Sequence, residues 1–287
     1  MKHSIIIPCY NSAALLAEQL AALSCQRWDE PWEVIVADNG STDDPAAVVA
    51  RFQERLPNLR LIDASARPGA AFARNQGAKA ARGEQLSFLD ADDVAGEGWL
   101  AAIGAALERH DFVASRHDFS RLNPPAVLAS RHNSQSEGLQ RYISPPYLPH
   151  AGGCGLGIKA WLHEAVGGFD ESFLCLEDTD YCWRVQLAGY DFAFVPAAVV
   201  HYRLRETLRG AAKQAFAYGE YNVKLYRRYR AEGMGAITVW RGLRAWYYLL
   251  RSLPRLFDGR ARARTVWSLV WRLGRLYGSL RYRVFAI

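Results

Sequence analysis

Three carboxylates follow directly on a short apolar segment, with a spacing that suits a divalent metal ion. Residues 85–89, Gln-Leu-Ser-Phe-Leu, read as a buried strand, and Asp90, Asp92 and Asp93 come immediately after it. Mg²⁺ and Mn²⁺ prefer such oxygen ligands, keep most of their waters and take further ligands from substrate phosphates. The structural alternative is an acidic turn in which Asp93 caps the next helix. This segment alone favours neither interpretation.

The elements that must position these carboxylates alternate between strand and helix. Apolar runs predict strands at residues 3–8, 32–37, 59–63 and 85–89, with helices between them. This alternation predicts an α/β fold with a parallel sheet and right-handed crossovers. Because ligands bind at the carboxyl ends of the strands in such sheets, we expect Asp90 and Asp92 to lie where a substrate binds.

Polar residues also follow the other predicted strands, which indicates a nucleotide pocket along one sheet edge. These residues are Tyr10 and Asn11, Asp38 and Asn39, and Arg67 and Gly69. Asp38 could accept a hydrogen bond from a base N–H, and the backbone around Gly69 could face phosphate. Arg74 and Asn75, on the next helix, reach the same place. No G-x-G-x-x-G follows the first strand and no G-x-x-x-x-G-K-[ST] occurs, which disfavours a dinucleotide site and excludes a P-loop.

A second acidic cluster opens a predicted helix in the later part of the chain. Glu177, Asp178 and Asp180 precede residues that read as helical up to Ala188. The helix dipole stabilises carboxylates at this position, so capping is the structural alternative to catalysis. We also expect a strand at 112–120, an irregular loop at 121–150 and close packing of the glycine cluster 152–157 near a ligand. Two strands at 192–195 and 198–201 are expected to end in His201.

The composition bounds the class of protein. Half of the 287 residues are hydrophobic, which allows a sizeable core in one or two domains. The five cysteines form no C-x-x-C pair, which argues against a structural zinc and a disulfide framework and favours a reducing compartment. We expect no signal peptide, because a strand begins at His3. We expect no membrane-spanning helix, because every window of about 18 residues carries charge.

The charge is divided between an acidic body and a basic tail. Residues 201–287 contain 19 Lys or Arg and 4 Asp or Glu, whereas the whole chain has a net charge of +6. The tail is predicted to be helical, and its second helix has an apolar stripe of Val239, Leu243, Trp246, Leu250 and Leu253 with arginines on another face. Basic amphipathic helices with tryptophans suit an anionic membrane surface. The alternative is that the stripes pack on the catalytic body or a second subunit. No motif supports nucleic-acid binding.

Seven motifs, in order along residues 3–203, together resemble the family-2 glycosyltransferases with the GT-A fold. They are Ile7-Pro-Cys-Tyr-Asn11, Val36-Ala-Asp-Asn-Gly-Ser-Thr-Asp43, Ala73-Arg-Asn-Gln-Gly77, Phe88-Leu-Asp-Ala-Asp-Asp93, Gly167-Gly-Phe-Asp-Glu171, Glu177-Asp-Thr-Asp-Tyr-Cys-Trp-Arg184 and Val200-His201. One departure is Arg67-Pro-Gly69, where many relatives carry Asn-x-Gly. The resemblance implies a Rossmann-like, mainly parallel sheet flanked by helices, with a C-terminal helical extension. It implies a catalytic domain over 1–203, with a nucleotide-binding half at 1–95 and an acceptor half at 96–203, followed by a basic helical region at 204–287.

The resemblance also implies roles for the matching residues. Asp178 would be the catalytic base, with Glu177 and Gly153 on the acceptor side. Asp90, Asp92 and His201 would hold Mn²⁺ or Mg²⁺. The residues that bind the nucleotide-sugar would be Pro8, Tyr10, Asn11, Asp38, Gly69, Arg74, Asn75, Asp90 and Ala91.

These inferences predict a metal-dependent, inverting hexosyl- or deoxyhexosyltransferase for cell-surface polysaccharide biosynthesis. It would move a sugar from a UDP or dTDP donor to a glycan or lipid-linked acceptor. Inversion is favoured because direct displacement needs one base, and Glu177 is expected to diverge from Asp178. We expect a cytoplasmic protein, peripheral on the inner face of the cytoplasmic membrane, without a nucleic-acid partner; self-association is left open.

Two other functions, a nucleotidyltransferase and a non-catalytic binding protein, are compatible with a sheet of this kind. A nucleotidyltransferase on a similar sheet would need a glycine-rich basic loop after the first strand, which Pro8-Cys-Tyr-Asn11 is not. A non-catalytic protein that binds a nucleotide-sugar or scaffolds membrane enzymes would not need Asp90, Asp92 and Asp178, which are all present.

Overall fold

The computed structural model describes residues 1–129, 131–143, 145–258 and 261–286. The chain divides into two compact units. The first comprises residues 1–121, 133–140 and 150–203, and the second comprises 122–132, 141–149 and 204–287.

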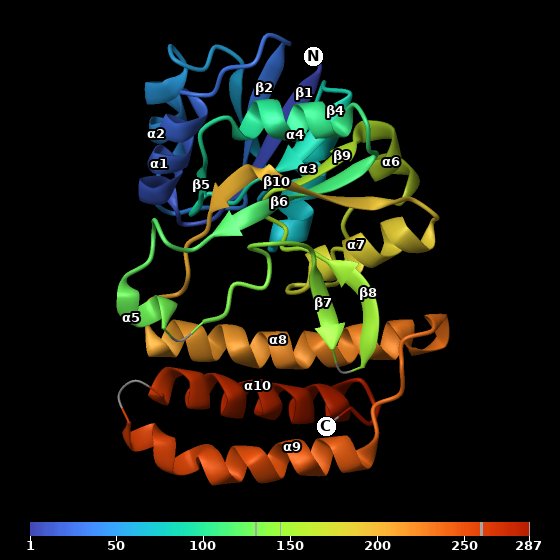
Figure 1. Cartoon of the computed structure of the whole chain (residues 1–287). Helices are drawn as coiled ribbons and strands as arrows, with labels where there is room; N and C mark the ends of the chain where they lie inside the picture. The colour runs from blue at the N-terminus through green and yellow to red at the C-terminus, as the bar shows by residue number, and fades with distance from the viewer. Residues whose placement is uncertain (130, 144, 259–260, 287) are drawn as a thin grey trace. The chain divides into compact units, whose positions relative to one another are not determined.

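The first unit is built on an eight-stranded, mostly parallel sheet (Figure 1). Its strands are β1 (His3–Cys9), β2 (Trp32–Asp38), β3 (Leu59–Asp63), β4 (Gln85–Phe88), β5 (Val94–Ala95), β6 (Phe112–Asp118), β9 (Leu156–Lys159) and β10 (Phe192–His201). Their order is β3-β2-β1-β4-β9-β6-β10-β5, and β5 and β9 run antiparallel to their neighbours. The other six strands point the same way, so their carboxyl ends lie along one edge. The predicted parallel pairing of the first four strands is confirmed.

Helices cover both faces of this sheet, which is why its central strands are continuous apolar runs. One face packs against α1 (Ala13–Leu23), α2 (Pro45–Phe52) and α4 (Trp99–Leu107). The other packs against α3 (Ala70–Ala80), α6 (Ala160–Ala165) and α7 (Glu177–Leu187). In β1, Ile5 and Ile7 join the first core and Ile6 the second, and all three are fully buried. Burial on both faces holds the strand ends, and hence the polar residues after them, in fixed positions.

Two strands differ from the sequence-based expectation. The glycine cluster at 152–157 leads into β9, a strand that the apolar pattern did not indicate. Residues 192–201 form the single strand β10, not two strands, with a register shift against β6 between Val195 and Val199. Pro196 has no N–H to donate, and an irregularity at this point lets both parts of β10 pair with β6.

The segment 121–150 is more regular than the predicted loop. It contains the short helix α5 (Pro125–Leu128) and a two-stranded ribbon of β7 (Gln140–Ile143) and β8 (Pro146–His150). Both strands of such a ribbon are edge strands, and prolines such as Pro146 and Pro149 are tolerated there because only alternate N–H groups face the partner strand. A segment rich in proline can therefore still form strands.

The second unit is mainly helical. Its helices are α8 (Leu208–Tyr229), the 3₁₀ turn η1 (Arg230–Glu232), α9 (Val239–Ser252), the 3₁₀ turn η2 (Leu253–Phe257) and α10 (Arg262–Arg281). Glycines allow α8 and α10 to approach closely, because a Cβ on Gly219 or Gly274 would meet the backbone of the other helix. Among the described residues, no helix has both the length and the apolar character needed to cross a bilayer.

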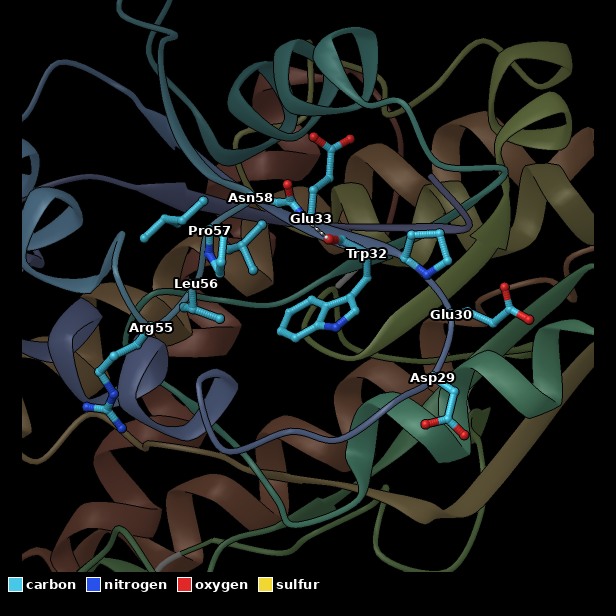
Figure 2. A pocket seen from close by; sticks show the side chains of 11 residues that line it. Asp29, Glu30, Trp32, Glu33, Arg55, Leu56, Pro57 and Asn58 are labelled. Carbon is cyan, nitrogen blue, oxygen red and sulfur yellow. Dashed lines mark hydrogen bonds between the residues drawn. The ribbon is translucent and has the colours of Figure 1, made fainter.

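A pocket of about 320 Å³ lies at the amino ends of β2 and β3 (Figure 2). Trp32, Glu33, Arg55 and Leu59 are among the residues that line it. Because β2 begins at Trp32 and ends at Asp38, the pocket lies at the sheet edge opposite the polar strand ends. It is therefore separate from the candidate site.

Candidate active site

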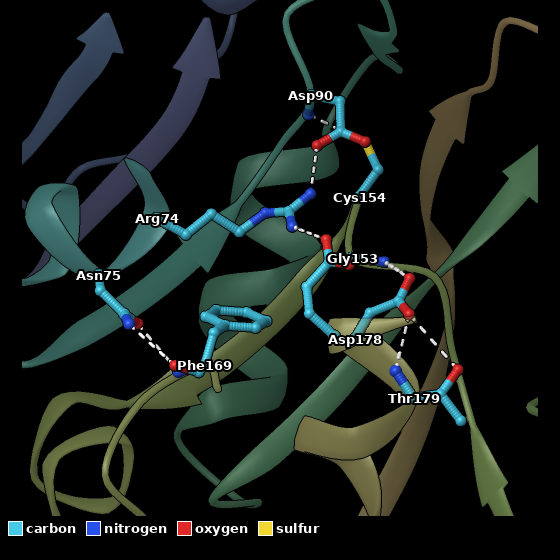
Figure 3. Close-up of polar contacts among 9 residues, drawn as sticks. Arg74, Asn75, Asp90, Gly153, Cys154, Phe169, Asp178 and Thr179 are labelled. Atoms are coloured by element: carbon cyan, nitrogen blue, oxygen red, sulfur yellow. Dashed lines mark hydrogen bonds and ion pairs between the residues drawn. The ribbon is translucent and has the colours of Figure 1, made fainter. Parts of the chain in front are cut away.

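A buried arginine joins the two acidic clusters of the sequence (Figure 3). The side chain of Arg74, on α3, is 4% exposed. Its NH2 donates to Asp90 Oδ1 at 2.6 Å and its NH1 to Glu177 Oε1 at 2.7 Å. Burial alone would lower the pKa of this guanidinium, but the charges of Asp90 and Glu177 outweigh burial and raise it. Arg74 therefore stays charged and holds the end of β4 beside the start of α7.

Among the described residues, no ion pair joins the neighbouring carboxylate of Asp178 to a cation, since Arg74 pairs with Asp90 and Glu177. Asp178 Oδ2 accepts from the Gly153 N–H at 2.8 Å, and its Oδ1 from the Thr179 N–H at 2.7 Å (Figure 3). Burial, and next the charge of Glu177, raise the pKa of Asp178 to about 7, although Arg74 opposes this. A carboxylate with this pKa can accept a proton near neutral pH, which is what a general base needs.

Asp180, the third acid of this cluster, has a structural role. It is fully buried and accepts from Arg184 Nε at 2.8 Å, one helical turn later. Arg184 also donates to the carbonyl oxygens of Val166 and Gly168. Asp180 is therefore held by an ion pair within α7, which differs from the predicted capping of the helix start.

The turn after β4 is held from several sides. The Arg203 N–H donates to Asp93 Oδ1 at 2.7 Å, and Arg203 Nε donates to the Asp92 backbone oxygen at 2.9 Å. Asp93 is buried, and burial together with the charges of Asp90 and Asp92 raises its pKa well above the ordinary value. Asp93 does not cap α4, since its carboxylate binds the chain beyond β10.

Ligand atoms of Asp90, Asp93 and Cys154 lie within 4.8 Å of one another, and this group could hold a metal ion. Of the predicted metal ligands Asp90, Asp92 and His201, this group contains Asp90, together with Asp93 from the same turn and Cys154 from the segment before β9. Asp93 Oδ2 is a buried carboxylate oxygen without a hydrogen bond in the described part of the chain. A buried oxygen in that state fits a cation at this turn, and carboxylate oxygens are the donors that Mg²⁺ and Mn²⁺ prefer.

His201 reaches this sheet edge at the end of β10. Its Nδ1 lies 2.8 Å from Asp118 Oδ2, at the end of the adjacent strand β6. Hydrogen bonds from Ser120 and His201 lower the pKa of Asp118, although its partial burial opposes them. A carboxylate on one ring nitrogen is the usual support for a histidine that binds metal through the other nitrogen.

The residues predicted to bind the base lie after β1 and β2. Asp38 Oδ1 accepts from the Ser41 N–H, and Asn11 Oδ1 accepts from the N–H and hydroxyl of Thr42. Tyr10 is 61% exposed, so its ring is available to a ligand. Pro8 is half-buried and Ala91 is buried. The structure thus brings these loops together by direct hydrogen bonds between them.

Two predicted phosphate-side residues instead have partners in the protein. The Gly69 N–H donates to Asn39 Oδ1 at 2.8 Å. The Asn75 amide accepts from the Phe169 N–H and donates to the Phe169 oxygen (Figure 3). It also donates to Glu171 at 3.0 Å. These contacts fix the loop after β3 and the Gly167–Glu171 turn, so both residues support the site's walls.

Sequence reasoning missed Asp118, Cys154 and Arg203 as parts of the site. Asp118 carried a usable signal, because it is a polar residue at the end of a predicted strand. Cys154 and Arg203 carried none, because neither a lone cysteine among glycines nor one arginine in a basic tail indicates a site by its type or spacing.

Comparison with known proteins assigns the family. Residues 4–165 match the model for glycosyl transferase family 2, which covers more than half of the chain. The glycosyltransferase AglE of Haloferax volcanii is 27% identical over 270 residues, 93% of this chain and 80% of AglE. The uncharacterized glycosyltransferase YfnE of Bacillus subtilis is 43% identical over 101 residues, 35% of this chain and 26% of YfnE. The chain spans less than half the length of several such relatives, including 36% of a chondroitin synthase from Escherichia coli.

Solved structures share the fold. A mannosyltransferase, PcManGT from Pyrobaculum calidifontis in complex with GDP-Man and Mn²⁺, has a TM-score of 0.65 at 20% identity, covering 96% of this chain and 87% of that one. S. aureus TarS 1–349 in complex with UDP-GlcNAc has a TM-score of 0.57 at 18% identity, covering 100% and 93%. The chain therefore belongs to glycosyl transferase family 2 and is a glycosyltransferase with the GT-A fold.

Proposed function

We propose that this glycosyltransferase is metal-dependent and inverts the anomeric centre of its donor sugar. It moves a hexosyl or deoxyhexosyl group from a UDP or dTDP donor to a hydroxyl of a glycan or lipid-linked acceptor. The observation that carries the proposal is the Arg74 bridge, which holds Asp90 and the start of α7 beside the base Asp178. Family membership alone would not specify this arrangement.

Donor binding is assigned to the loops after β1, β2 and β4. Asp38, Asn11 and the exposed ring of Tyr10 lie where the base is expected, and the Asp90–Asp93 turn lies where the diphosphate is expected. Asp90 and Asp92 would hold the divalent ion with help from His201. When bound, the ion would neutralise the negative charge that develops on the diphosphate leaving group.

Asp178 is assigned the proton transfer. The N–H groups of Gly153 and Thr179 fix the direction of its carboxylate. Its pKa of about 7 lets it remove the proton of an acceptor hydroxyl while that oxygen attacks the sugar carbon. Gly153 precedes β9, so the backbone that orients the base also forms the acceptor side.

Inversion is inferred from the ion pair and the burial of Glu177. A retaining double displacement would need a second carboxylate free to attack the sugar. Glu177 is the adjacent candidate, but its Oε1 is bound to Arg74 at 2.7 Å and its side chain is 11% exposed. With Glu177 held by this ion pair, Asp178 acts alone, and one displacement inverts the centre.

The acceptor class rests on the relatives. The relatives include a chondroitin synthase from Escherichia coli and a pre-mycofactocin glycosyltransferase from Mycobacterium tuberculosis. We assign this chain to cell-surface polysaccharide assembly.

The test measures release of nucleoside diphosphate from UDP-, dTDP- and GDP-sugars in the presence of Mn²⁺, pooled sugar acceptors and a lipid extract. Asp178→Asn should lower kcat by about 10²- to 10⁴-fold, because it removes the base but keeps the shape. Asp191→Asn, an exposed acid at the opposite end of β10, should leave kcat unchanged. Unchanged release by Asp178→Asn would contradict the assignment of the base, and NMR of the product would test inversion.

A further inference from the structure

Helix α9 exposes an apolar surface that a helix of a soluble protein normally buries. Val239, Leu243 and Leu250 are between 50% and 58% exposed, and Trp240 is 80% exposed. Gly242 and Leu249 are the buried residues of this helix. Three of the five residues of the predicted stripe therefore face outward in the second unit, and Trp246 and Leu253 are partly buried. In this unit α10 lies between α8 and α9 (Figure 1). At its end, Phe257 of η2 is 90% exposed.

Arginines border this apolar surface on one side. At about 100° of rotation per residue, Val239, Leu250, Leu243, Tyr247 and Trp240 fall within an arc of about 100°. Arg251 and Arg244 occupy roughly the next 40° of the helix surface, ahead of Arg241. All three arginines are exposed. The helix thus presents an apolar arc with a cationic border, which is the pattern of helices that lie in a membrane interface.

The described residues do not neutralise the cationic border. Residues 239–257 contain four arginines and no Asp or Glu. Within the described part of the chain, no ion pair joins Arg241, Arg244, Arg251 or Arg255 to a carboxylate. Arg251 instead donates to the Tyr247 hydroxyl at 3.1 Å, and Arg244 lies over the Tyr248 ring. These contacts direct the guanidinium groups along the helix surface and leave their charge available to a partner.

We propose that α9 and η2 form a docking surface for an anionic lipid bilayer. The apolar arc enters the boundary between headgroups and acyl chains, and Arg241, Arg244, Arg251 and Arg255 bind lipid phosphates. Charge complementarity selects this partner. A second copy of the chain would bring the same arginines against themselves, whereas an anionic bilayer supplies both the apolar layer and the opposite charge. The inference stands independently of the proposed function.

The test is co-sedimentation of the full chain with vesicles at physiological ionic strength. Vesicles of phosphatidylcholine with about one-third phosphatidylglycerol should bind the protein, and pure phosphatidylcholine vesicles should not. Changing all four arginines of α9 and η2 to Gln should weaken binding by up to about 1000-fold. The matched control changes four exposed arginines of the first unit to Gln: Arg27, Arg51, Arg109 and Arg116. This control should bind as the wild type does, and circular dichroism should show that both variants are folded.

A second variant separates the bilayer from the other occupants. Trp240→Ser with Leu243→Ser should also weaken vesicle binding, and sedimentation velocity should give the same mass for this variant and the wild type. A dimer that dissociates in this variant would show that a second copy covers the arc and would overturn the proposal. Absence of vesicle binding, equal binding to neutral vesicles, or equal weakening by the control would overturn it too.

Discussion

The two edges of the central sheet each hold a buried acidic side chain next to an arginine, with opposite consequences. At the amino ends of β1 and β2, Glu33 is 1% exposed and accepts from Arg60, Ser4 and the Arg82 N–H. These donors lower the pKa of Glu33, although burial opposes them. At the carboxyl ends, Arg74 is used by Asp90 and Glu177, and Asp178 is left with two backbone donors and a raised pKa.

The opposite pKa shifts distinguish Glu33, a structural carboxylate, from Asp178, a reactive one. Glu33 has the cation Arg60 in addition to neutral donors, and its contacts join β1, β2 and β3 to the segment after α3. Asp178 is incompletely compensated beside a like charge, which makes protonation easier. Perturbed carboxylates of this kind gather at functional sites.

The largest expected effect is on stability when the two arginines are removed. Arg74→Met leaves Asp90 and Glu177 without their cation in a buried place and should lower the free energy of unfolding by about 3–5 kcal/mol. Arg60→Met should cost about 1–2 kcal/mol, because Glu33 keeps its other donors and Arg60 is 30% exposed. Urea denaturation measures both, with Arg74→Lys as the variant that keeps the charge. Equal losses for the two Met variants would mean that the edges do not differ.

The second prediction concerns the pH dependence of turnover. Asp178 must be deprotonated to act, so kcat/KM for nucleoside diphosphate release should rise about tenfold per pH unit below its pKa and level off above about 7. Glu33→Gln should leave this profile unchanged, since Glu33 lies at the other edge. A flat profile between pH 5 and 8 in the wild type would contradict the assigned base.

The third prediction concerns stability against pH, where the two acids should have opposite signs. The folded pKa of Glu33 is below 4.5, so its stabilisation is present above pH 4.5 and is lost as the pH falls through the lowered value. The free energy of unfolding of the wild type should exceed that of Glu33→Gln by about 2 kcal/mol at pH 7, and this difference should disappear at acidic pH. The folded pKa of Asp178 is above 3.8, so the protonated carboxyl contributes to the stability of the folded state. This contribution is present in full below pH 3.8 and is lost as the pH rises through about 7. Asp178→Asn should therefore gain stability relative to wild type above pH 7, and urea denaturation across pH checks both signs.

The smallest expected effect concerns the support of His201. Asp118→Asn keeps a hydrogen-bond partner for Nδ1 but removes the charge that favours metal binding at the other nitrogen. Mn²⁺ affinity in the presence of a nucleoside diphosphate, followed by electron paramagnetic resonance, should fall about tenfold. Asp111→Asn, just before the start of β6, is the matched control and should retain full affinity. An unchanged affinity in Asp118→Asn would remove His201 from the metal site.

The sequence predicted the parts of the fold that are periodic and local. Alternating strands and helices indicated the parallel order around β1 and β4, and polar strand ends placed Asp38 and Asp90 on one edge. β9 was missed because a glycine-rich lead-in hides its short apolar run and because an antiparallel insertion has no periodic signal. The bulge in β10 depends on pairing with β6, which no local pattern records.

The site was predictable as a set of residues but not as a set of contacts. Asp90, Asp178 and Arg74 were all identified, yet their connection spans more than 100 residues between Arg74 and Glu177. The ion pair between Arg74 and Glu177 determines that Glu177, and not the adjacent Asp178, is neutralised. The tail shows the same limit, since its period predicted an apolar stripe but could not decide between a membrane surface and packing on the protein, and three of the five stripe residues are exposed.

The most direct test of the central claim is calorimetric titration of UDP, dTDP, GDP, CDP and ADP, with and without Mn²⁺. The wild type should bind a uridine or thymidine diphosphate, more tightly with Mn²⁺ than without it. Asp92→Ala should lose the metal-dependent part, while Asp178→Asn should bind as the wild type does, because the base acts on the acceptor. Failure of the wild type to bind any of these nucleotides under either condition would contradict the assignment of this sheet edge as a donor site.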